Sequence, residues 1–473
     1  MQLASTATLT RGLSPPDAAR LRKVLRYCDT HLSSVIRHGR ETYAQHCRKV
    51  AGVVAELHSD CSLLCAALLH DLPMHPDGAR LLRASPLTAE ERQLVRGMQR
   101  LRKRQIDAKT DDLDLVIQSF MRAPGLLLLR MAHRVNDVRV LSGFRPALRR
   151  PLAEETLHMY AAIAGRIGLH RWRSEMEDRC FLALQPRIAG QIRNAYQRRR
   201  RTDDVCLELS QRFLRRALRE RGIQAMVDSR RKGLYSTYRK MAIKQRPFDK
   251  LTDRLAVRII VTDIDTCYRA LGVVHATMHP IPGKLKDYIG APKENGYRSI
   301  HTVVFPLPGI SDQPIEIQIR TADMHRECEF GIASHGRYKA MAYKLGEREA
   351  HVNLLRNLAM LRTEAKTPAE FGDALRTYFR GDQLLLFNPH GTIAHLPKGA
   401  TALDFAYSIA GDRAARLREV RINGRVRMPD TPLADGDTVD IRCGRTPAAM
   451  PKWLHACALP ATRRAVARWL EQR

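Results

Sequence analysis

The sequence lacks the features that mark secreted and membrane-spanning proteins. No signal-peptide pattern stands at its N-terminus, and no window reaches about 18 uninterrupted apolar residues. Its ten cysteines include no C-x-x-C pair, and Cys61 and Cys65 lie in an apolar helix pattern where buried free thiols are expected. We therefore expect a cytoplasmic protein with reduced cysteines and no contact with membranes.

Acidic residues are scarce relative to basic ones. The chain of 473 residues has 49 Asp and Glu against 80 Lys and Arg, which gives a net charge of +31. This excess predicts attraction to polyanions, either nucleic acid or anionic metabolites, and a solvated basic surface is the alternative. Hydrophobic residues make up 44%, which is enough for a sizeable core and argues against wholesale disorder.

The chain divides into segments with different hydrophobic patterns, and no repeats or low-complexity tracts interrupt them. We predict a multidomain α+β protein with an all-α N-terminal domain, a mixed α/β central domain and a small β-grasp domain. An Asn423-Gly424 pair supplies a strong hairpin turn signal in the β-grasp segment. The predicted boundaries are 1–195 (helical), 196–345 (mixed), 346–383 (helical linker), 384–445 (β-grasp) and 446–473 (basic C-terminal tail).

One predicted strand of the central segment has an apolar and a polar face. From Ile315 onward, three isoleucines alternate with Glu316, Gln318 and Arg320, and strand side chains alternate between faces. We expect the isoleucines in a core and the three polar side chains in a wet, charged cleft. This combination favours a phosphate-rich ligand with a metal ion.

A second predicted strand, residues 255–262, supplies another carboxylate and a guanidinium. Asp253 stands just before this strand and Arg258 lies within it. Because a guanidinium buried without a partner is costly, we expect Arg258 to face the same cleft as Glu316. If Asp253 and Glu316 converge, they can hold Mg²⁺ against ATP phosphates, and one of them can accept a proton from an attacking hydroxyl.

Two further groups of polar residues point to nucleotide binding. Lys232, Ser236 and Lys240 are spaced four apart, so on a helix they would share one face and fit a row of phosphates; a solvated lysine stripe is the alternative. Tyr297 lies in a polar, turn-like loop where a base can stack on it, with a core aromatic as the alternative. The donors around it are Lys286, Lys293, Asn295 and His301.

These residues lie in motifs that resemble the RelA/SpoT homologue family, the synthetases and hydrolases of the alarmone (p)ppGpp. The flanking segments resemble the family's helical HD hydrolase domain and its TGS domain, a β-grasp fold, and the central domain is similar to its nucleotidyltransferase-like synthetase. The motifs occur in the family's order: R-x-K-x-x-Y-S (Arg230–Ser236), D-x-L-A-x-R (Asp253–Arg258), K-D-Y-I (Lys286–Ile289), P-K-x-N-G-Y-x-S-x-H-T (Pro292–Thr302) and E-I-Q-I-R-T (Glu316–Thr321).

The resemblance implies a GTP diphosphokinase of the stringent response, which transfers the β,γ-pyrophosphate of ATP to the 3′-hydroxyl of GTP or GDP and releases AMP. It implies that Asp253 and Glu316 bind Mg²⁺ and that Glu316 activates the hydroxyl. Tyr297 would stack on guanine. The implied ATP residues are Arg230, Lys232, Ser236, Lys240 and Arg258, and the implied acceptor residues are Lys286, Lys293, Asn295, Tyr297, His301 and Gln318.

The helical domain departs from the active hydrolases that it resembles. Three of the family's four metal ligands match His46, His70 and Asp71, but the fourth position is His133 instead of an aspartate. Imidazole still binds transition metals, so Mn²⁺ is compatible with this ligand set.

The residues that handle the water in active hydrolases are also changed. Met74 and His75 replace the family's acidic Glu-Asp pair, and Asp137 stands where the family has an Asn near the substrate. Without the carboxylate pair, water activation should fail. We therefore expect a pseudo-hydrolase domain that serves as a scaffold or as a regulator of the synthetase, with no catalysis by bound Mn²⁺.

The TGS-like segment and the basic surface leave the partners open. Ribosome-associated members read uncharged tRNA with a TGS histidine, but the corresponding stretch here has Ala410 and Ala415 and no histidine. The family's zinc-finger and ACT regions also have no counterpart, so we do not expect sensing of stalled ribosomes, although a ribosome, RNA or protein partner is compatible with the basic surface. Two alternatives to the synthetase stay open: a catalytically silent regulatory protein that binds RNA or protein, and a pyrophosphokinase acting on another acceptor.

Overall fold

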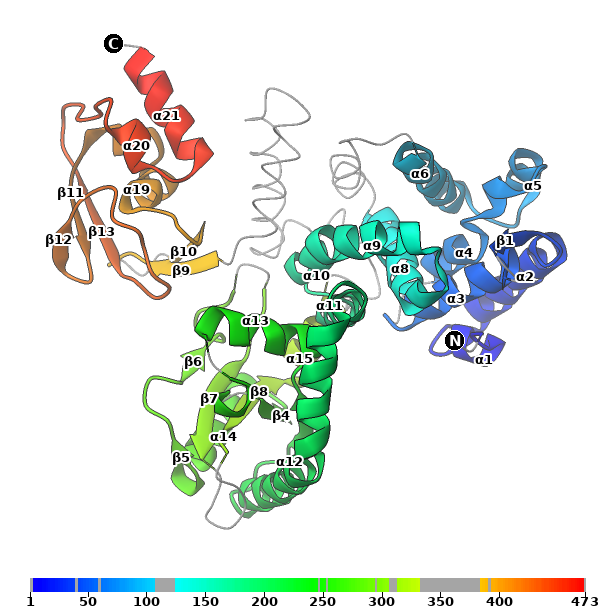
Figure 1. Cartoon of the computed structure of the whole chain (residues 1–473), viewed down its shortest axis with the longest axis horizontal. Helices are drawn as coiled ribbons and strands as arrows, with labels where there is room; N and C mark the ends of the chain where they lie inside the picture. The colour runs from blue at the N-terminus through cyan, green and yellow to red at the C-terminus, as the bar shows by residue number, and fades with distance from the viewer. Residues whose placement is uncertain are drawn as a thin grey trace. The chain divides into compact units, whose positions relative to one another are not determined.

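Two units make up the chain in the computed structural model, Met1–Leu358 and Ala359–Arg473 (Figure 1). The first unit combines a helical part with a mixed sheet, and the second is a β-grasp module, as the sequence predicts. None of the described helices has the length and apolarity needed to cross a bilayer. The structure describes residues 3–38, 41–57, 61–106, 124–245, 247–251, 254–293, 296–305, 313–331, 383–389 and 393–471.

Helices fill the N-terminal part of the first unit. Helix α4 is buried almost throughout because α2, α3, α6 and α8 pack around it. The all-α prediction missed a hairpin, β1 (Ile36–His38) and β2 (Glu41–Thr42), which is too short to produce a readable alternation. The helices are α1 Thr6–Thr10, α2 Pro15–Leu32, α3 Tyr43–Ala55, α4 Cys61–Leu69, α5 Gly78–Ala84, α6 Ala89–Ile106, α8 Pro124–Arg139, α9 Pro146–Glu155, α10 Ala161–Arg166 and α11 His170–Leu184.

The cysteines are free, as their spacing predicts. All ten lack a disulfide partner, and every one except Cys443 is buried. The sulfur atoms of Cys61 and Cys65 lie 3.7 Å apart on α4, which is a non-bonded contact between thiols.

A mixed sheet forms the centre of the first unit, with strand order β3-β4-β8-β7-β5 and β6 paired to β7. Strands β4 and β8 are parallel, and the other pairs are antiparallel. The two strands predicted above, over residues 255–262 and from Ile315 onward, correspond to β4 and β8. The bounds are β3 Met226–Arg231, β4 Leu255–Val261, β5 His279–Pro280, β6 Lys286–Asp287, β7 Ile300–Phe305 and β8 Ile315–Thr321.

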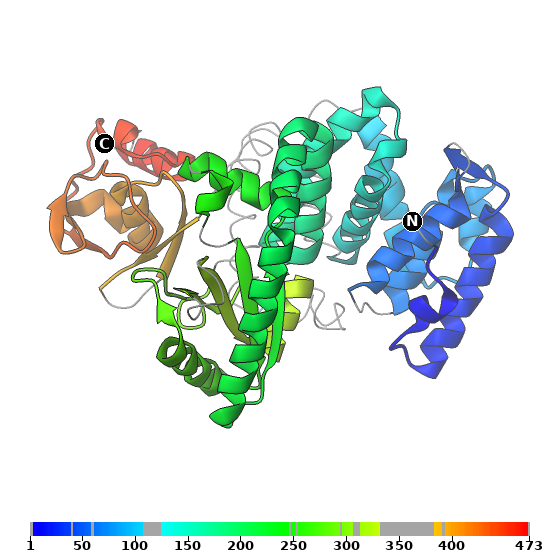
Figure 2. The same ribbon diagram turned by 60° about the horizontal axis from the view of Figure 1, so that its bottom comes forward.

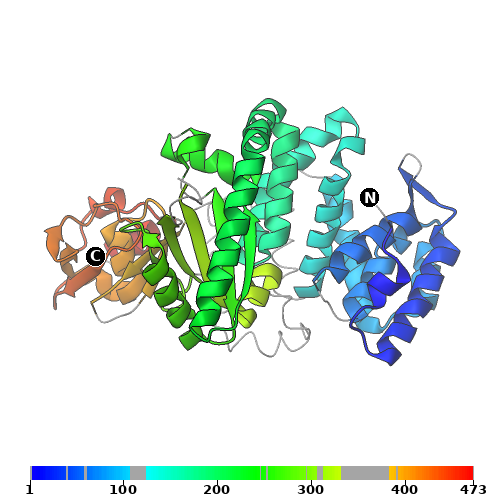
Figure 3. The same cartoon turned by 90° about the horizontal axis from the view of Figure 1, so that it is seen from below.

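Two helices cover the apolar face of this sheet. Helix α12 (Pro186–Glu220) runs along β3 and β4, and α14 (Ile264–Thr277) packs on β7 and β8 (Figures 2 and 3). Asp263 caps α14 by accepting from the Thr266 backbone N–H. The predicted boundary at residue 195 falls inside α12, a continuous helix whose first turns pack on α11 and whose later turns join the sheet core.

The second unit has the β-grasp arrangement that the sequence predicts. Asn423 and Gly424 both have positive φ, 51° and 79°, as the two-residue hairpin between β11 and β12 requires. A parallel bridge between Phe387 and Thr438 joins the β9–β10 pair to the three-stranded sheet. The elements are β9 Gln383–Phe387, β10 Ile393–Pro397, α19 Ala402–Ala410, β11 Leu417–Ile422, β12 Arg425–Arg427 and β13 Val439–Cys443. The predicted linker 346–383 lies outside the described residues, except for Gln383.

The segment predicted as a basic C-terminal tail folds instead into two helices on the β-grasp core, α20 (Trp453–Ala456) and α21 (Pro460–Glu471). Trp453 and Val466 are buried in that core. The carboxylate of Asp404 accepts from the backbone N–H groups of Ala458 and Leu459, at 3.0 and 3.2 Å. The basic composition of this stretch hid its helical apolar spacing.

Candidate functional site

The polar face of the central sheet gathers the predicted nucleotide residues. Across the strands, Arg258 is paired with Gln318, Gln318 with His301, and His301 with Lys286. Residues opposite one another share a face, so these four form a row over β4, β8, β7 and β6. Glu316 lies two residues before Gln318 and therefore on the same face. The isoleucines of β8 are fully buried on the other face, so the predicted alternation is confirmed.

Glu316 is the central carboxylate of this face. Its Oε1 lies 3.3 Å from His301 Nδ1, and its Oε2 accepts from Gln318 Nε2 at 2.8 Å. Burial opposes ionisation, but the contacts with His301 and Gln318 and the charge of Lys232 lower the pKa of Glu316 to about 2. Arg320 Nη2 donates to Gln318 Oε1 at 3.0 Å and so fixes the orientation of the amide. Glu316 is therefore ionised at neutral pH, as a metal ligand must be.

Tyr297 lies in an aromatic cluster at the edge of this face. Its hydroxyl is 2.6 Å from His301 Nε2, and its ring centroid is 5.9 Å from that of Tyr288 and 5.7 Å from that of His170. Lys293 Nζ lies 4.5 Å from the Tyr288 centroid and 5.4 Å from the Tyr297 centroid. Burial raises the pKa of Tyr297, so the phenol stays neutral. Sequence reasoning missed Tyr288, and also His170, which comes from α11 of the helical part.

The lysine group is arranged differently from the prediction. Helix α13 spans Leu234–Lys244, so it carries Ser236 and Lys240, whereas Lys232 lies two residues before its start. The three residues therefore do not form one helical stripe. The Lys232 and Lys240 side chains nevertheless lie next to each other, and burial lowers the pKa of Lys232 while the charge of Glu316 opposes this shift.

The N-terminus of α13 is held by residues that the sequence analysis did not single out. Asp178 on α11 accepts from the Tyr235 backbone N–H at 2.9 Å through its Oδ1. The cap residue of α13 is Gly233, and a Cβ there would come within 2.8 Å of Asp178 Oδ2. On α12, the Tyr196 hydroxyl donates to the Lys232 carbonyl at 3.1 Å. Gly233 thus allows a carboxylate from the helical part to cap a helix of the sheet domain.

The two arginines predicted at ATP lie on β3 and β4. Arg230 is paired with Ala256, and Ala256 with Glu316, so Arg230 shares the polar face. Arg258 Nη1 lies 3.4 Å from Glu329 Oε1 on helix α15 (Ala322–Phe330). The partner that the buried Arg258 guanidinium requires is therefore Glu329, which the sequence reasoning did not single out.

Two predicted site residues, Asp253 and Asn295, lie outside the described residues. The residue after Asp253 is well anchored, because the buried Arg254 guanidinium pairs with Asp203 of α12 at 2.7 Å. The convergence of Asp253 with Glu316 stays a prediction.

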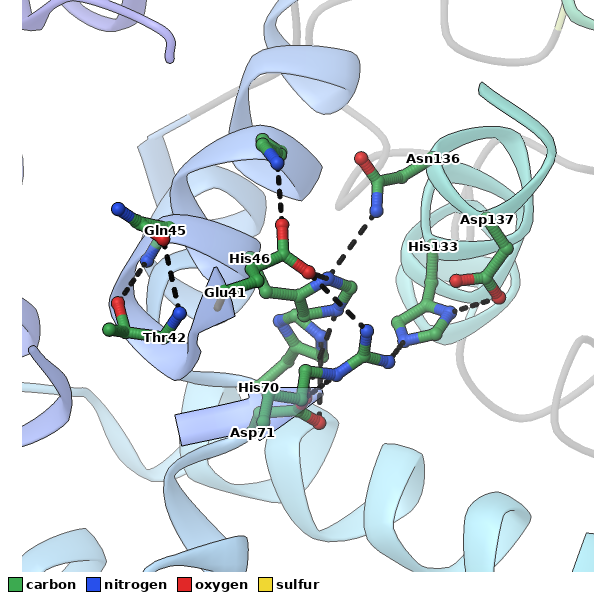
Figure 4. A network of polar contacts seen from close by, with 11 residues as sticks. Glu41, Thr42, Gln45, His46, His70, Asp71, His133, Asn136 and Asp137 are labelled. Atoms are coloured by element: carbon green, nitrogen blue, oxygen red, sulfur yellow. Dashed lines mark hydrogen bonds and ion pairs between the residues drawn. The ribbon is translucent and has the colours of Figure 1, made fainter. Parts of the chain in front are cut away.

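The helical part brings its four predicted ligand residues together (Figure 4). His46 comes from α3, His70 and Asp71 follow α4, and His133 lies on α8. Their ligand atoms lie within 4.8 Å of one another, and all four residues are buried. Burial, with nearby His133 and Arg37, lowers the pKa of His46 well below its usual range, so its imidazole is neutral and able to bind a metal. These side chains fit a divalent ion.

Hydrogen-bonding partners and ion pairs surround this cluster. His133 Nδ1 lies 3.0 Å from Asp137 Oδ2, and Asn136 Nδ2 lies 3.4 Å from His46 Nδ1 (Figure 4). Arg37 Nε lies 3.4 Å from Asp71 Oδ2. Burial opposes the ionisation of Asp137, but the adjacent His133 holds its pKa below the usual range. The sequence reasoning recorded Asp137 only as a departure from the family; the structure places it against His133.

Three family models match the chain: the HD domain over residues 25–170, the region found in RelA/SpoT proteins over 229–343, and the TGS domain over 385–443. The chain belongs to the RelA/SpoT homologue family. Within that family it carries these three domains in the order HD, RelA/SpoT, TGS.

The chain is similar to curated relatives over most of its own length. The bifunctional (p)ppGpp synthase/hydrolase SpoT of Escherichia coli is 34% identical over 435 residues, 89% of this chain and 60% of that protein. The GTP pyrophosphokinase rsh of Brucella ovis is 32% identical over 460 residues, 95% of this chain and 61% of that protein. The chain thus spans about 60% of the length of these relatives.

A solved structure is also similar to part of the chain. The small alarmone synthetase 1 from Bacillus subtilis, bound to its product pppGpp, is 23% identical and covers 37% of this chain and 99% of that chain, with a TM-score of 0.27.

Proposed function

We propose that this protein is a (p)ppGpp synthetase, a GTP diphosphokinase that transfers the β,γ-pyrophosphate of ATP to the 3′-hydroxyl of GTP or GDP and releases AMP. The observation that carries the proposal is an ionised Glu316 at the centre of a polar sheet face, with lysines near α13 on one side and the Tyr297 loop on the other. Family membership supports this assignment. We also place the protein in the cytoplasm, since free cysteines persist in reducing compartments.

The polar face would divide between two nucleotides. ATP would lie at Arg230, Lys232, Ser236, Lys240 and Arg258, and the acceptor at Lys286, Lys293, Asn295, Tyr297, His301 and Gln318. Both groups supply cations and donors, and phosphoryl-type transfer is mostly positioning and charge neutralisation.

Glu316, with Asp253, would hold Mg²⁺, which neutralises phosphate charge when bound. The low pKa of Glu316 supports this role more directly than the role of base, because base strength falls with pKa. Removal of the proton from the 3′-hydroxyl is nevertheless assigned to Glu316, since its carboxylate contacts His301 and Gln318 on the acceptor side.

We propose further that the helical domain has lost hydrolase activity. The pocket beside the metal-ligand cluster is lined by Met74, Met98, Gln99 and Arg130 together with cluster residues, and Asp71 is the only carboxylate among the described lining residues. A group able to activate water for attack on ppGpp is therefore missing where active hydrolases have an acidic pair.

The test is a transfer assay with γ-labelled ATP, Mg²⁺ and, in turn, GTP, GDP, an adenine nucleotide and tRNA. We expect a labelled 3′-pyrophosphorylated guanine nucleotide, and a loss of rate of about 10²–10⁴-fold in Glu316→Gln if it acts as the base. Glu220→Gln, on the exposed surface of α12, is the matched control. Product from no acceptor would leave a binding protein, and product from another acceptor alone would redefine the enzyme.

The hydrolase arm uses ppGpp with Mn²⁺ and measures release of pyrophosphate. We expect none above background. Release at an enzyme-like rate would show that water activation survives without the acidic pair.

A further inference from the structure

His46, His70, Asp71 and His133 form a cluster, called here the His₃Asp cluster. Its side chains are arranged as a complete set of metal ligands and not as the remnant of a hydrolase centre. We propose that it is a closed structural site for zinc or an ion of similar chemistry. His133 would be the fourth ligand, and Asp137 would orient its imidazole. Three imidazoles and a carboxylate are ligand types that zinc takes, and four protein ligands are typical of sites that stabilise a fold rather than catalyse.

The imidazoles are oriented by partners outside the cluster. His70 Nδ1 lies 2.8 Å from the Ala67 carbonyl, and His133 Nδ1 lies 3.0 Å from Asp137 Oδ2. The Asn136 amide lies against His46 Nδ1, and turned by half a rotation it would present its Oδ1, which has no hydrogen-bond partner, as the acceptor. With each Nδ1 engaged in this way, each Nε2 is left to bind an ion, as in metal sites with a second shell of acceptors.

Two of the imidazole ligand atoms are not satisfied by hydrogen bonds. His46 Nε2 and His70 Nε2 are buried, have no hydrogen-bond partner among the described residues, and lie 3.8 and 3.6 Å from carboxylate oxygens of Asp71. Such an arrangement is costly for imidazole nitrogens unless an ion is bound. Ligands at about 2.0–2.2 Å from a tetrahedral zinc lie about 3.3–3.6 Å apart, so a cluster spanning 4.8 Å needs to contract by about 1.2–1.5 Å at its widest.

The space beside the cluster excludes a substrate. The pocket that His70 and His133 line has a volume of about 10 Å³, enough for about one water molecule. Met74 and Arg130 form part of its wall. This pocket of the described residues is therefore too small for a nucleotide beside an ion held by four side chains, which separates it from a hydrolytic centre.

A guanidinium competes for the same atoms. Arg37 Nη2 lies 3.5 Å from His133 Nε2, and Arg37 Nε lies 3.4 Å from Asp71 Oδ2. In the absence of an ion, Arg37 provides the positive charge that buried Asp71 requires. An incoming dication would displace it, so Arg37→Ala should bind zinc more tightly than the native chain.

A bound ion would stabilise the fold because its ligands come from separate elements. The ligands come from α3, from the residues after α4, and from α8, so one ion would connect three segments of the helical part. Binding that occurs only in the folded state raises the stability of that state.

The experiment uses the full chain, stripped by a chelator and kept in excess Mg²⁺ to occupy hard-ion sites. Zinc and manganese affinities are measured by chelator competition, and melting temperature and metal content per chain are read separately. We expect about one zinc per chain and a higher melting temperature with zinc. Asp137→Asn should lower zinc affinity about 10–100-fold, and His133→Asp should lower the ratio of zinc to manganese affinity.

The ratio of zinc to manganese affinity is compared between His133→Asp and the native chain, because zinc binds most N/O sites more tightly than manganese does. His158→Asn, an exposed histidine outside the cluster, should change neither affinity. Asp137→Asn is nearly isosteric and should keep the fold, so its affinity is informative even if His133→Asp is unstable. Zinc affinity unchanged in Asp137→Asn, or hydrolysis of ppGpp by the zinc-loaded protein, would overturn the proposal.

Discussion

At the residue scale, Tyr297 combines the two roles considered for it from the sequence, a ring that stacks on a base and an aromatic residue of the core. Its ring is half-buried among Tyr288, His301 and His170, yet Lys293 and His301, both predicted at the acceptor, lie against it. A packed aromatic with cationic neighbours can both close a core and present an edge or face to a base.

Replacing Tyr297 separates these roles. Because stacking of a base on an aromatic ring is worth about 1–3 kcal/mol, Tyr297→Ala should raise the KM for GTP by about 5- to 150-fold. Tyr297→Phe keeps the ring and loses the 2.6 Å contact with His301, so its KM should stay near the native value. Steady-state kinetics with varied GTP at saturating ATP gives both numbers. A KM for GTP that Tyr297→Ala leaves unchanged would make the ring a core residue only.

Glu316 also predicts a pH dependence of stability. Its folded pKa of about 2 lies below the ordinary value of 4.5, so its ionised form stabilises the fold above pH 4.5 and this contribution is lost as pH falls through about 2. The contribution amounts to about 3 kcal/mol at most. Urea unfolding of native protein and Glu316→Gln between pH 7 and pH 3 should show the native chain losing stability faster. Parallel curves for the two proteins would contradict the low pKa.

The sequence predicted most of this face but not its connections. Alternation in β8 and the motif order located Glu316, Gln318, His301 and Tyr297, since these signals are local. The partners Asp178, His170 and Glu329 come from α11 and α15, and no local pattern links them to the sheet. Likewise, the resemblance to the family's hydrolase domain predicted His133, whereas the ion pair of Asp137 with His133 depended on side-chain orientation that only the fold determines.

At the scale of elements, α13 depends on a cap that another helix supplies. Asp178 of α11 accepts from the Tyr235 N–H, and Gly233 leaves the space for it. Loss of a helix N-cap costs about 0.5–2 kcal/mol. Since α13 carries Ser236 and Lys240, loss of the cap would displace these two side chains from the proposed phosphate contacts.

Asp178→Ala should therefore raise the KM for ATP by about 2- to 30-fold, the equivalent of the lost cap, and leave the KM for GTP nearly unchanged. Asp178→Asn, which still accepts, should recover much of the loss. Glu208→Ala on the exposed surface of α12, whose carboxylate pairs with Arg212 of the same helix, is the control. If both KM values rise together in Asp178→Ala, the carboxylate supports the whole domain and not α13 in particular.

Element types were predicted more reliably than element limits. The helical character of the N-terminal segment and the strands β4 and β8 follow from local patterns. The β1–β2 hairpin was missed because it is too short to show an alternation, and α20 and α21 because the basic composition of their segment hid the apolar spacing. The start of α13 after Lys232 was missed because it depends on a cap from the distant Asp178.

At the scale of the whole molecule, the helical part and the sheet domain belong to one unit. Phe181 of α11 stacks on Tyr238 of α13 with ring centroids 4.9 Å apart, and it also contacts Tyr235 at 5.6 Å. Helix α11 also contacts both sides of the site. Asp178 caps α13 on the proposed ATP side, and His170 contacts Tyr297 on the proposed acceptor side. The domain that we regard as a pseudo-hydrolase would thus hold the synthetase site in place.

A chain shortened to residues 186–473 tests this dependence, because it keeps α12 and the sheet but removes α11 with Phe181, Asp178 and His170. We expect it to lose more synthetase activity than Asp178→Ala alone, since an aromatic pair and a ring contact are lost with the cap. Its melting temperature, compared with that of the full chain, reports the packing loss separately from the kinetic one. Equal activity and stability in the two chains would mean that the sheet domain works alone, and that the helical part is kept for another reason, such as the ion site.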